Sequence, residues 1–305
     1  MIEIVGKTNI DFMGKRTLVF ACSGILILLG LVALVQIARG VANLSIDFSG
    51  GASVQVKFDK PVEIDAVRLA LETNGLHQAE LQEFVGTNKI LVRVKTSNTM
   101  EEQVADRIVA AFNREFPGNG LTMESSMVIG PIIGAQLRQD ALIAILVSMA
   151  GIVLYVSARF EMRFGVAAAL AMTHDVLVVL GLFCLLDKEI TLLVVTALLT
   201  LAGYSLTDKV VVFDRIRENL QARRRESATM IINDSINQVL SRTIVTSLTV
   251  VVVLIPLAVT GGEVLHDFSL ALLWGIIIGT YSSIFVASPL LLLLPGRVSA
   301  LLTRP

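Results

Sequence analysis

Six long runs of apolar residues dominate the hydropathy pattern of this 305-residue chain. A helix needs roughly 20 apolar residues to cross about 30 Å of hydrocarbon, and each run approaches or exceeds that length. The predicted spans are residues 17–37, 139–158, 164–186, 190–213, 240–260 and 268–294. The first run is too long for a signal-peptide core and has no convincing cleavage site, so we expect it to remain as an anchor. The pattern therefore predicts a polytopic α-helical membrane protein with six transmembrane helices.

Residues 38–138, between the first two spans, show the alternating pattern of a soluble α+β domain. Period-two stretches predict strands, and stretches of period 3.6 predict helices. In chain order the pattern predicts a strand at Ala52–Phe58, a helix at Ile64–Thr73, a hairpin of Gln78–Val85 and Lys89–Lys95, a helix at Met100–Phe116 and a strand at Leu121–Ile129. The order βαββαβ favours a ferredoxin-like layer of helices on an antiparallel sheet. A small αβ domain of another topology remains the alternative.

The distribution of lysine and arginine predicts the orientation of the spans, because short cytoplasmic loops are enriched in these residues. Twelve lie in the N-terminal segment 1–16, in the loops after the second and fourth spans, and in the tail 297–305. They are Lys7, Lys15, Arg16, Arg159, Arg163, Arg215, Arg217, Arg223, Arg224, Arg225, Arg297 and Arg304. The short loops of the other side carry only Lys188. Both termini are therefore predicted to be cytoplasmic and residues 38–138 to face the outside.

The composition narrows the class of protein further. Hydrophobic residues make up 54% of the chain, mean hydropathy is +0.75 and 17% of residues are charged, against about 25% in soluble domains. The formal net charge is −1, and the sequence has no basic patch with interleaved aromatic residues. We therefore expect no nucleic-acid partner, and membrane lipid as the main surrounding of the six spans.

The sequence carries no pattern typical of a metal centre or of covalent catalysis. Cys22 and Cys184 lie in apolar runs, as small buried hydrophobic residues do, and no CxxC, HExxH or GxSxG motif occurs. The three histidines, His77, His174 and His266, are far apart. We therefore expect no disulfide framework, no metal, no cofactor and no enzymatic activity.

Asp208 is the most informative residue, because apolar sequence surrounds it from Ile190 to Phe213. A charge inside a bilayer costs several kcal/mol, and membrane proteins seldom carry one unless it moves protons, binds an ion or pairs with a cation. Asp175, preceded by His174, lies near the middle of the third span. Its position fits either a proton relay or a structural carboxylate that is hydrogen-bonded to a neighbouring helix.

Arg242 is the expected partner of Asp208. The apolar run Ile244–Val259 is only about 24 Å long as a helix, so the fifth span must begin earlier and take Arg242 into the membrane. Both groups then lie at similar depth in the cytoplasmic third, where an arginine beside a carboxylate allows both to be buried. The alternative is a flanking arginine that snorkels to the headgroups.

Further polar residues share the helix faces of Asp208 and Arg242 at spacings of three, four and seven, and predict a hydrated seam between the fourth and fifth spans. The predicted seam-lining residues are Tyr204, Ser205, Thr246 and Thr249. Lys209 follows Asp208 directly and is rotated from it by about 100° around the helix. We therefore expect Lys209 to face away from the seam and to snorkel toward the cytoplasm.

Small residues mark two further features. Gly275, Gly279, Ser283 and Ala287 recur at intervals of four in the last span, which predicts close helix packing or a docking face for a partner's helices. Glycine and proline also cluster at both ends of the 38–138 domain, where we expect pivots. The hinge candidates are Gly50, Gly51, Gly130, Pro131 and Gly134.

The run Gly203–Asn219, GYSLTDKVVVFDRIREN, resembles the fourth-span signature of the SecF family, accessory subunits of the bacterial Sec protein-export machinery. Segments along nearly the whole chain agree with the same family. They are Asn9–Arg16, Ile46–Gly51, Arg159–Glu161, His174–Asp175, Ser235–Gln238, Leu240–Thr243 and Gly279–Ser283. Two positions depart from the family pattern: Thr207 replaces the usual asparagine, and Lys209 replaces a small uncharged residue.

The resemblance implies a role in protein export. SecF is similar to half of a resistance-nodulation-division transporter, and it pairs with SecD, which supplies six further spans. The family is expected to use the proton-motive force to pull unfolded chains out of the SecYEG channel after SecA has pushed them in. A YidC-type insertase and YajC are further expected partners. The resemblance also implies a bacterial cytoplasmic (inner) membrane, a periplasmic 38–138 domain and functional roles for Asp208 and Arg242.

A mechanism follows as a hypothesis. If the distance between Asp208 and Arg242 changes between two conformations, the proton affinity of Asp208 changes with it. Proton uptake from one side and release to the other would then drive the hinge, with protons as the coupling ion. Two alternatives remain: a passive scaffold whose outer domain holds emerging chains, and half of a proton-coupled exporter of small apolar molecules.

Overall fold

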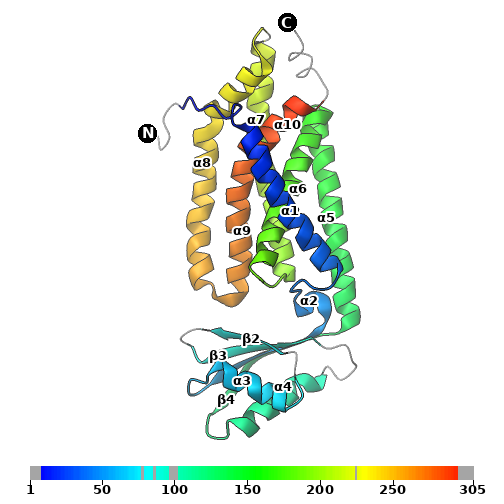
Figure 1. The fold of residues 1–305 in the computed structure, drawn as a ribbon, viewed down its shortest axis with the longest axis vertical. Coiled ribbons are helices and arrows are strands. Elements are labelled where there is room, and N and C mark those ends of the chain that lie inside the picture. Colours follow the sequence, from blue (N-terminus) through cyan, green and yellow to red (C-terminus); the bar gives the residue numbers. More distant parts are fainter. Residues whose placement is uncertain (1–7, 77–78, 85–86, 96–101, 224, 295–305) are drawn as a thin grey trace. The chain divides into compact units, whose positions relative to one another are not determined.

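The computed structural model describes residues 8–76, 79–84, 87–95, 102–223 and 225–294, with the backbone alone for residues 102–103 and 263–264. Some predicted features lie outside the described residues. They are the tail 297–305, the basic residues Lys7, Arg224, Arg297 and Arg304, and the predicted strand and helix ends at Gln78, Val85 and Met100. The chain divides into two compact units (Figure 1): a helical unit (residues up to 43, 144–189 and from 193 on) and a sheet unit (44–143 with 190–192).

Within the described residues, six helical segments are long and apolar enough to cross a membrane, which agrees with the predicted number of spans. Five of them are single α-helices, and the sixth contains the π-helix η1. They are α1 (Arg16–Ala38), α5 (Pro131–Arg159), α6 (Met162–Leu185), α7 (Leu192–Ala222), α8 (Ala228–Thr260), and α9 (Gly262–Ser282) continued by η1 (Ser283–Ala287) and α10 (Ser288–Leu293). The helices α7 and α8 extend past the apolar runs, because their polar ends continue the helical hydrogen bonding beyond the predicted span.

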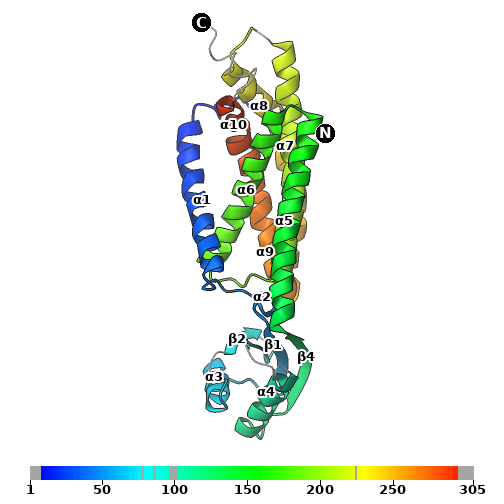
Figure 2. The ribbon, with the colours of Figure 1, turned by 90° about the vertical axis from the view of Figure 1, so that its right-hand side faces the viewer.

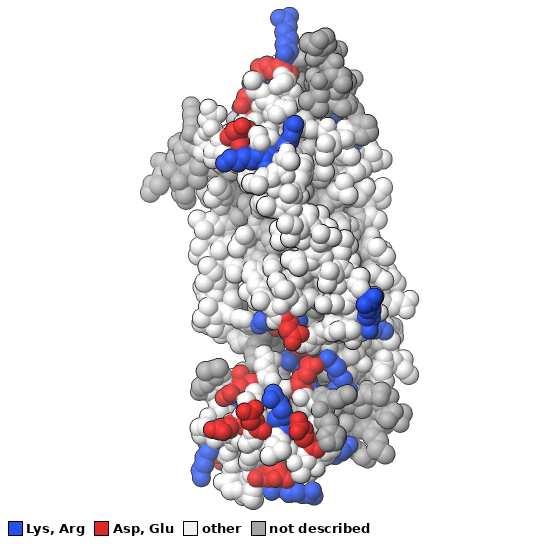
Figure 3. Space-filling model, viewed as in Figure 1, with Lys and Arg blue, Asp and Glu red and all other residues white. Residues whose placement is uncertain are grey.

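The six spans separate into inner and outer helices. In the most apolar windows, 56% of residues are buried in α6 and 61% in the last span, but only 6% in α5 and 17% in α1 and α8. Figure 2 shows α6 between α1 and α5. The middle of the visible face of the helical unit in Figure 3 shows no charged side chains. Large apolar side chains such as Leu28, Leu154 and Val253 are exposed on the outer helices, as expected for contact with lipid.

The helices α1 and α6 approach each other closely at a pair of glycines. A Cβ atom on Gly30 would lie 2.4 Å from the carbonyl oxygen of Leu177, and one on Gly181 would lie 2.8 Å from the Gly30 nitrogen. Small residues at such a crossing let two backbones pack directly in lipid. The sequence analysis missed this pair, because each glycine is isolated in its own span.

The predicted small-residue stripe of the last span packs against α7. A Cβ on Gly275 would lie 2.4 Å from Leu201 Cδ2, and one on Gly279 would lie 2.7 Å from Ser205 Oγ. Ser283 and Ala287 are fully buried in the π-helix η1. The last span and α7 therefore meet over glycine positions, at the level where the polar residues described below gather.

In its described part, the sheet unit holds four antiparallel strands in the order β2-β3-β1-β4. The elements follow one another in the predicted order, with the short helix α2 (Ile46–Ser49) added before β1. They are β1 (Gly51–Phe58), α3 (Ile64–Thr73), β2 (Ala79–Phe84), β3 (Lys89–Val94), α4 (Glu102–Glu115) and β4 (Leu121–Ile129). Inward-facing residues such as Val54, Val92, Ile108 and Phe112 form its hydrophobic core with Val67.

The five hinge candidates lie together where β1 begins and β4 ends. Gly50 and Gly51 adopt positive φ angles of 75° and 141°, which favour glycine. A Cβ on Gly134 would lie 2.9 Å from the Gly50 nitrogen, and one on Gly50 would lie 2.8 Å from Pro131 Cα. The glycines thus allow the start of α5 to touch the Gly50 backbone. Pivoting at this point stays a prediction.

Candidate functional site

A buried ion pair lies between α6 and α7. Asp175 and Lys209 are 1% and 0% exposed, and the Lys209 Nζ atom lies 2.7 Å from Asp175 Oδ2. Lys209 Nζ also donates to Ser205 Oγ at 2.5 Å and to Ser282 Oγ, on α9, at 3.0 Å. The ion pair and its serines therefore connect three of the inner helices.

The structure corrects the prediction that Lys209 snorkels toward the cytoplasm. Its side chain is fully buried and reaches across to α6 instead. A buried lysine is tolerated when a carboxylate and hydroxyl groups satisfy its three donors. Lys209 does face away from Asp208, as predicted, because it bonds with α6 and α9 whereas Asp208 lies next to polar groups of α8.

The Asp175 carboxylate has donors on both oxygens. Ser205 Oγ donates to Oδ2 at 2.7 Å, and His174 Nδ1 lies 3.0 Å from Oδ1. Toward an ionised Asp175, which can only accept, this contact is a hydrogen bond when the His174 ring carries its proton on Nδ1. Ser205 therefore belongs to the Asp175 cluster and not to the predicted seam with α8.

Asp208 has a different environment. It is 7% exposed, and its Oδ2 atom is buried with no hydrogen-bond partner among the described residues. Ser247 and Thr246 on α8, together with the cations Lys209 and Arg242, are the groups that act on its charge. Asp208 is thus a carboxylate inside the helical unit with room on one oxygen for a proton.

The predicted direct ion pair between Asp208 and Arg242 is not formed: no such pair lies within 4 Å in the part of the chain that the structure describes. Arg242 is exposed, and its neighbour Thr243 takes the buried face of α8. Arg242 still attracts the Asp208 carboxylate electrostatically. The two charges therefore lie on adjoining helices and interact without touching in this conformation.

The structure brings together only part of the predicted seam. The Tyr204 hydroxyl donates to the backbone oxygen of Thr246 at 3.1 Å, which joins α7 to α8. The Thr246 hydroxyl bonds with the carbonyl of Arg242 at 3.0 Å, and the Thr249 hydroxyl bonds with the carbonyl of Thr246 at 2.7 Å. The hydroxyl groups of both threonines therefore donate within α8 and not across the predicted seam.

Sequence reasoning missed several polar residues of this region. Ser247 is hydrogen-bonded with Thr280 at 2.6 Å, between α8 and α9. The Tyr281 hydroxyl lies 3.0 Å from Ser23 Oγ on α1, and its ring lies 6.3 Å from that of His174. A signal was present in the sequence, since Thr280, Tyr281 and Ser282 follow Gly279 directly.

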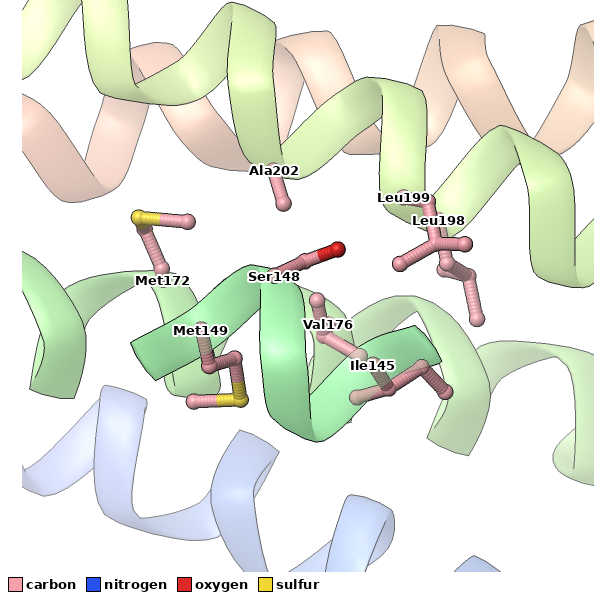
Figure 4. Close-up of a pocket in the computed structure, with 8 residues that line it drawn as sticks. All are labelled: Ile145, Ser148, Met149, Met172, Val176, Leu198, Leu199 and Ala202. Carbon is pink, nitrogen blue, oxygen red and sulfur yellow. The ribbon is translucent and has the colours of Figure 1, made fainter. Parts of the chain in front are cut away.

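A cavity lies between α5, α6 and α7 (Figure 4). Its walls are apolar except for the Ser148 hydroxyl. The lining residues are Ile145, Ser148, Met149, Met172, Val176, Leu198, Leu199 and Ala202. No titratable side chain lines this cavity, so it is distinct from the charged cluster. Among the described residues, no group of three or more His, Cys, Asp and Glu side chains is placed to hold a metal ion.

Comparisons with known proteins relate this arrangement to one family. The family model described as "Protein export membrane protein SecD/SecF, C-terminal" matches residues 108–297, and the "SecD/SecF GG Motif" model matches residues 42–62. The protein translocase subunit SecF of Thermodesulfovibrio yellowstonii is 50% identical over 96% of this chain and 97% of that protein. This chain belongs to the SecF family. The SecF of Calditerrivibrio nitroreducens is 41% identical over 95% of this chain and 96% of that protein.

Solved SecDF structures share the fold. The crystal structure of SecDF from Thermus thermophilus, described as a translocon-associated membrane protein, has a TM-score of 0.82 and 38% identity, covering 94% of this chain. A SecDF structure in a super-membrane-facing form has a TM-score of 0.71 and 39% identity over 97% of this chain. This SecF-family chain covers only 38% and 40% of those chains. It is a multi-pass membrane protein that corresponds to one part of SecDF.

Proposed function

We propose that this chain is the SecF subunit of a Sec-type protein translocase and works with SecD in the bacterial cytoplasmic membrane. Relatives at 50% and 41% identity over nearly their whole length are protein translocase subunits. The SecDF chains are much longer than this one, so a separate SecD subunit would supply the missing part. SecYEG, a YidC-type insertase, YajC and the exported polypeptide are the further partners that the family resemblance implies.

The proposal includes an orientation. The sheet unit would face the periplasm and both termini the cytoplasm, which the lysine and arginine distribution supports. Its strand order β2-β3-β1-β4, with α3 and α4 as the crossover helices, supports a ferredoxin-like fold for this domain.

Asp208 carries the proposed mechanism. A buried carboxylate with an unpartnered oxygen is costly while it is charged, so this residue can exchange a proton during the transport cycle. Approach of Arg242 would favour the charged form, and separation would favour the protonated form. Each proton that crosses the membrane gains about 2.3 kcal/mol per 100 mV. The proton is the only coupling ion in this scheme, which needs no cofactor and no enzymatic step.

The test is late-stage preprotein translocation in proteoliposomes that hold the full Sec complex, with a proton gradient imposed or collapsed. Asp208→Asn should assemble normally and lose the gradient-dependent part of translocation, because asparagine cannot exchange a proton. The matched control is Asp214→Asn on the same helix, where the side chain is 48% exposed and lies 3.9 Å from Arg159. It should respond to the gradient as the wild type does.

The alternatives predict other results. If Asp208→Asn translocates like the wild type and still responds to the gradient, the membrane charges only secure helix packing and the chain is a passive scaffold. If gradient-driven efflux of small apolar molecules depends on Asp208 while translocation does not, the chain is half of an exporter.

A further inference from the structure

The ammonium group of Lys209 is fully satisfied inside the helical unit. Its three hydrogen-bond partners are Asp175 Oδ2 at 2.7 Å, Ser205 Oγ at 2.5 Å and Ser282 Oγ at 3.0 Å. An ammonium has three donors, so none is left over. With a side chain that is 0% exposed, Lys209 is held as a cation in a site shaped for one.

The same geometry favours Asp175 as an anion. Lys209 and Ser205 both donate to Oδ2, and His174 Nδ1 lies 3.0 Å from Oδ1. A protonated Asp175 would find no acceptor on the Oδ2 side, where Lys209 and Ser205 both donate. It would also leave the lysine cation buried without a counter-ion, which is strongly destabilising.

The packing around the pair keeps it in place. Gly279 on α9 comes so near that an added Cβ would lie 2.7 Å from Ser205 Oγ and 3.7 Å from Asp175 Oδ2. Ser282 ends α9 immediately before the π-helix η1, an insertion type often found at functional sites. Besides the pair itself, the titratable groups around it are His174 on α6, Tyr281 on α9 and Asp208 on α7.

The hydrogen-bond partners and neighbouring charges of Asp208 differ from those of Asp175. Its Oδ2 atom has no hydrogen-bond partner among the described residues. The charged and titratable groups that face it are Lys209 and Tyr204 of α7 and Arg242 of α8. Lys209 is engaged with Asp175, and Arg242 does not reach the carboxylate. Asp175 is therefore held as the counter-ion of Lys209, whereas Asp208 can take up a proton.

We propose that Lys209 is a positioning residue that keeps Asp175 permanently ionised, so that Asp208 and not Asp175 exchanges the proton. The half of the proposal that concerns Asp208 rests on the proposed function. The half that concerns Asp175 does not.

The experiment is infrared spectroscopy of the purified full chain in nanodiscs, titrated from alkaline to acidic pH. A protonated carboxylic acid has a carbonyl stretching band that a carboxylate lacks. Bands are assigned by their loss in Asp175→Asn and in Asp208→Asn. In the wild type we expect a buried-acid band that Asp208→Asn removes and none that Asp175→Asn removes. Lys209→Met should add a band for one further carboxyl, which Asp175→Asn then removes.

Two controls accompany Lys209→Met. Lys209→Arg keeps the charge and should not produce the Asp175 band. Arg217→Met removes a cation elsewhere on α7 and should also leave Asp175 ionised. An Asp175 band in the wild-type protein overturns the proposal, and this arm needs no substitution at Lys209. Absence of the band in folded Lys209→Met also overturns it. If Asp208 shows no band at any pH while Asp175 behaves as expected, the proton-coupling function fails and the role of Lys209 stands.

Discussion

At the scale of single residues, the partners of a buried carboxylate decide what it can do. Asp175 is surrounded by donors and a cation, whereas Asp208 keeps one oxygen without a partner among the described residues. Gly279 contributes indirectly, because its missing side chain leaves room for Ser205 and thereby for the ion pair.

We expect Gly279→Ala to destabilise the protein by about 1–3 kcal/mol, the usual cost of overpacking. The new methyl group would lie 2.7 Å from Ser205 Oγ and push this hydroxyl away from Asp175. Gly203→Ala is the matched control on α7, where an added Cβ meets no atom within 4 Å. It should be neutral or stabilising by about 0.5–1 kcal/mol. Thermal unfolding in detergent compares the two, and equal effects would contradict the packing described here.

At the scale of elements, α8 links the polar membrane residues to the segment that precedes α1. The Asn237 side chain accepts a hydrogen bond from the Ile10 N–H at 2.9 Å and donates one to the Ile10 carbonyl at 2.9 Å. The Asn233 side chain accepts a hydrogen bond from the Phe12 N–H at 2.8 Å. Phe12 is 5% exposed and packs edge-on against Phe285. Two amide side chains one helical turn apart therefore bind the backbone of residues 10–13 through hydrogen bonds.

We expect Asn237→Ala to loosen this segment. The substitution removes both hydrogen bonds with Ile10. At about 1 kcal/mol for each bond, amide exchange should become roughly 5- to 30-fold faster where the segment opens locally. Hydrogen–deuterium exchange of the peptide that contains Ile10 and Phe12 measures it. Met230→Ala, on an exposed position of the same helix, serves as the control and should leave exchange unchanged. Unchanged exchange in Asn237→Ala would show that buried Phe12 and Met13 suffice to hold the segment.

The connection between α7 and α8 has its own charge network. Arg223 forms ion pairs with Glu226 and, at 2.7 Å, with Asp234. The hydrogen bond from Arg223 lowers the pKa of Glu226. The contribution of this hydrogen bond to the stability of the fold is therefore present above the pKa of Glu226 in the unfolded state. It is lost as the pH falls through the lower pKa of Glu226 in the folded state. At neutral pH this turn keeps its charges paired.

At the scale of the whole molecule, the basic residues predict which side of the membrane each unit faces. Asp65 lies on α3 of the sheet unit with a side chain that is 86% exposed, and Arg225 is an exposed residue between α7 and α8. The basic residues predict opposite sides for these two positions.

A labelling experiment tests this prediction. After replacement of Cys22 and Cys184 by alanine, Asp65→Cys should react with a membrane-impermeant maleimide in intact spheroplasts. Arg225→Cys should react only after the membrane is permeabilised. The reverse pattern would invert the proposed orientation, and labelling of both positions in intact spheroplasts would contradict the assigned topology.

The sequence by itself determined the elements and the family. Hydropathy over roughly 20 residues identifies a membrane helix without reference to its neighbours, and the period of apolar residues placed the strands and helices of residues 51–129 almost to their observed ends. The signature Gly203–Asn219 pointed to SecF, and the apolar sequence around Asp208 marked its charge as the one that needs an explanation.

Only the tertiary structure decided which polar groups meet. Lys209 and Asp175 are 34 positions apart, and no local pattern states how two helices are rotated against each other. That rotation turned Lys209 inward to a carboxylate, turned Ser205 away from the predicted seam and left Arg242 on the exposed face of α8. It also joined Gly30 to Gly181. The physical reason is that a buried charge takes the partner that three-dimensional packing offers, and this partner lies far away in the sequence.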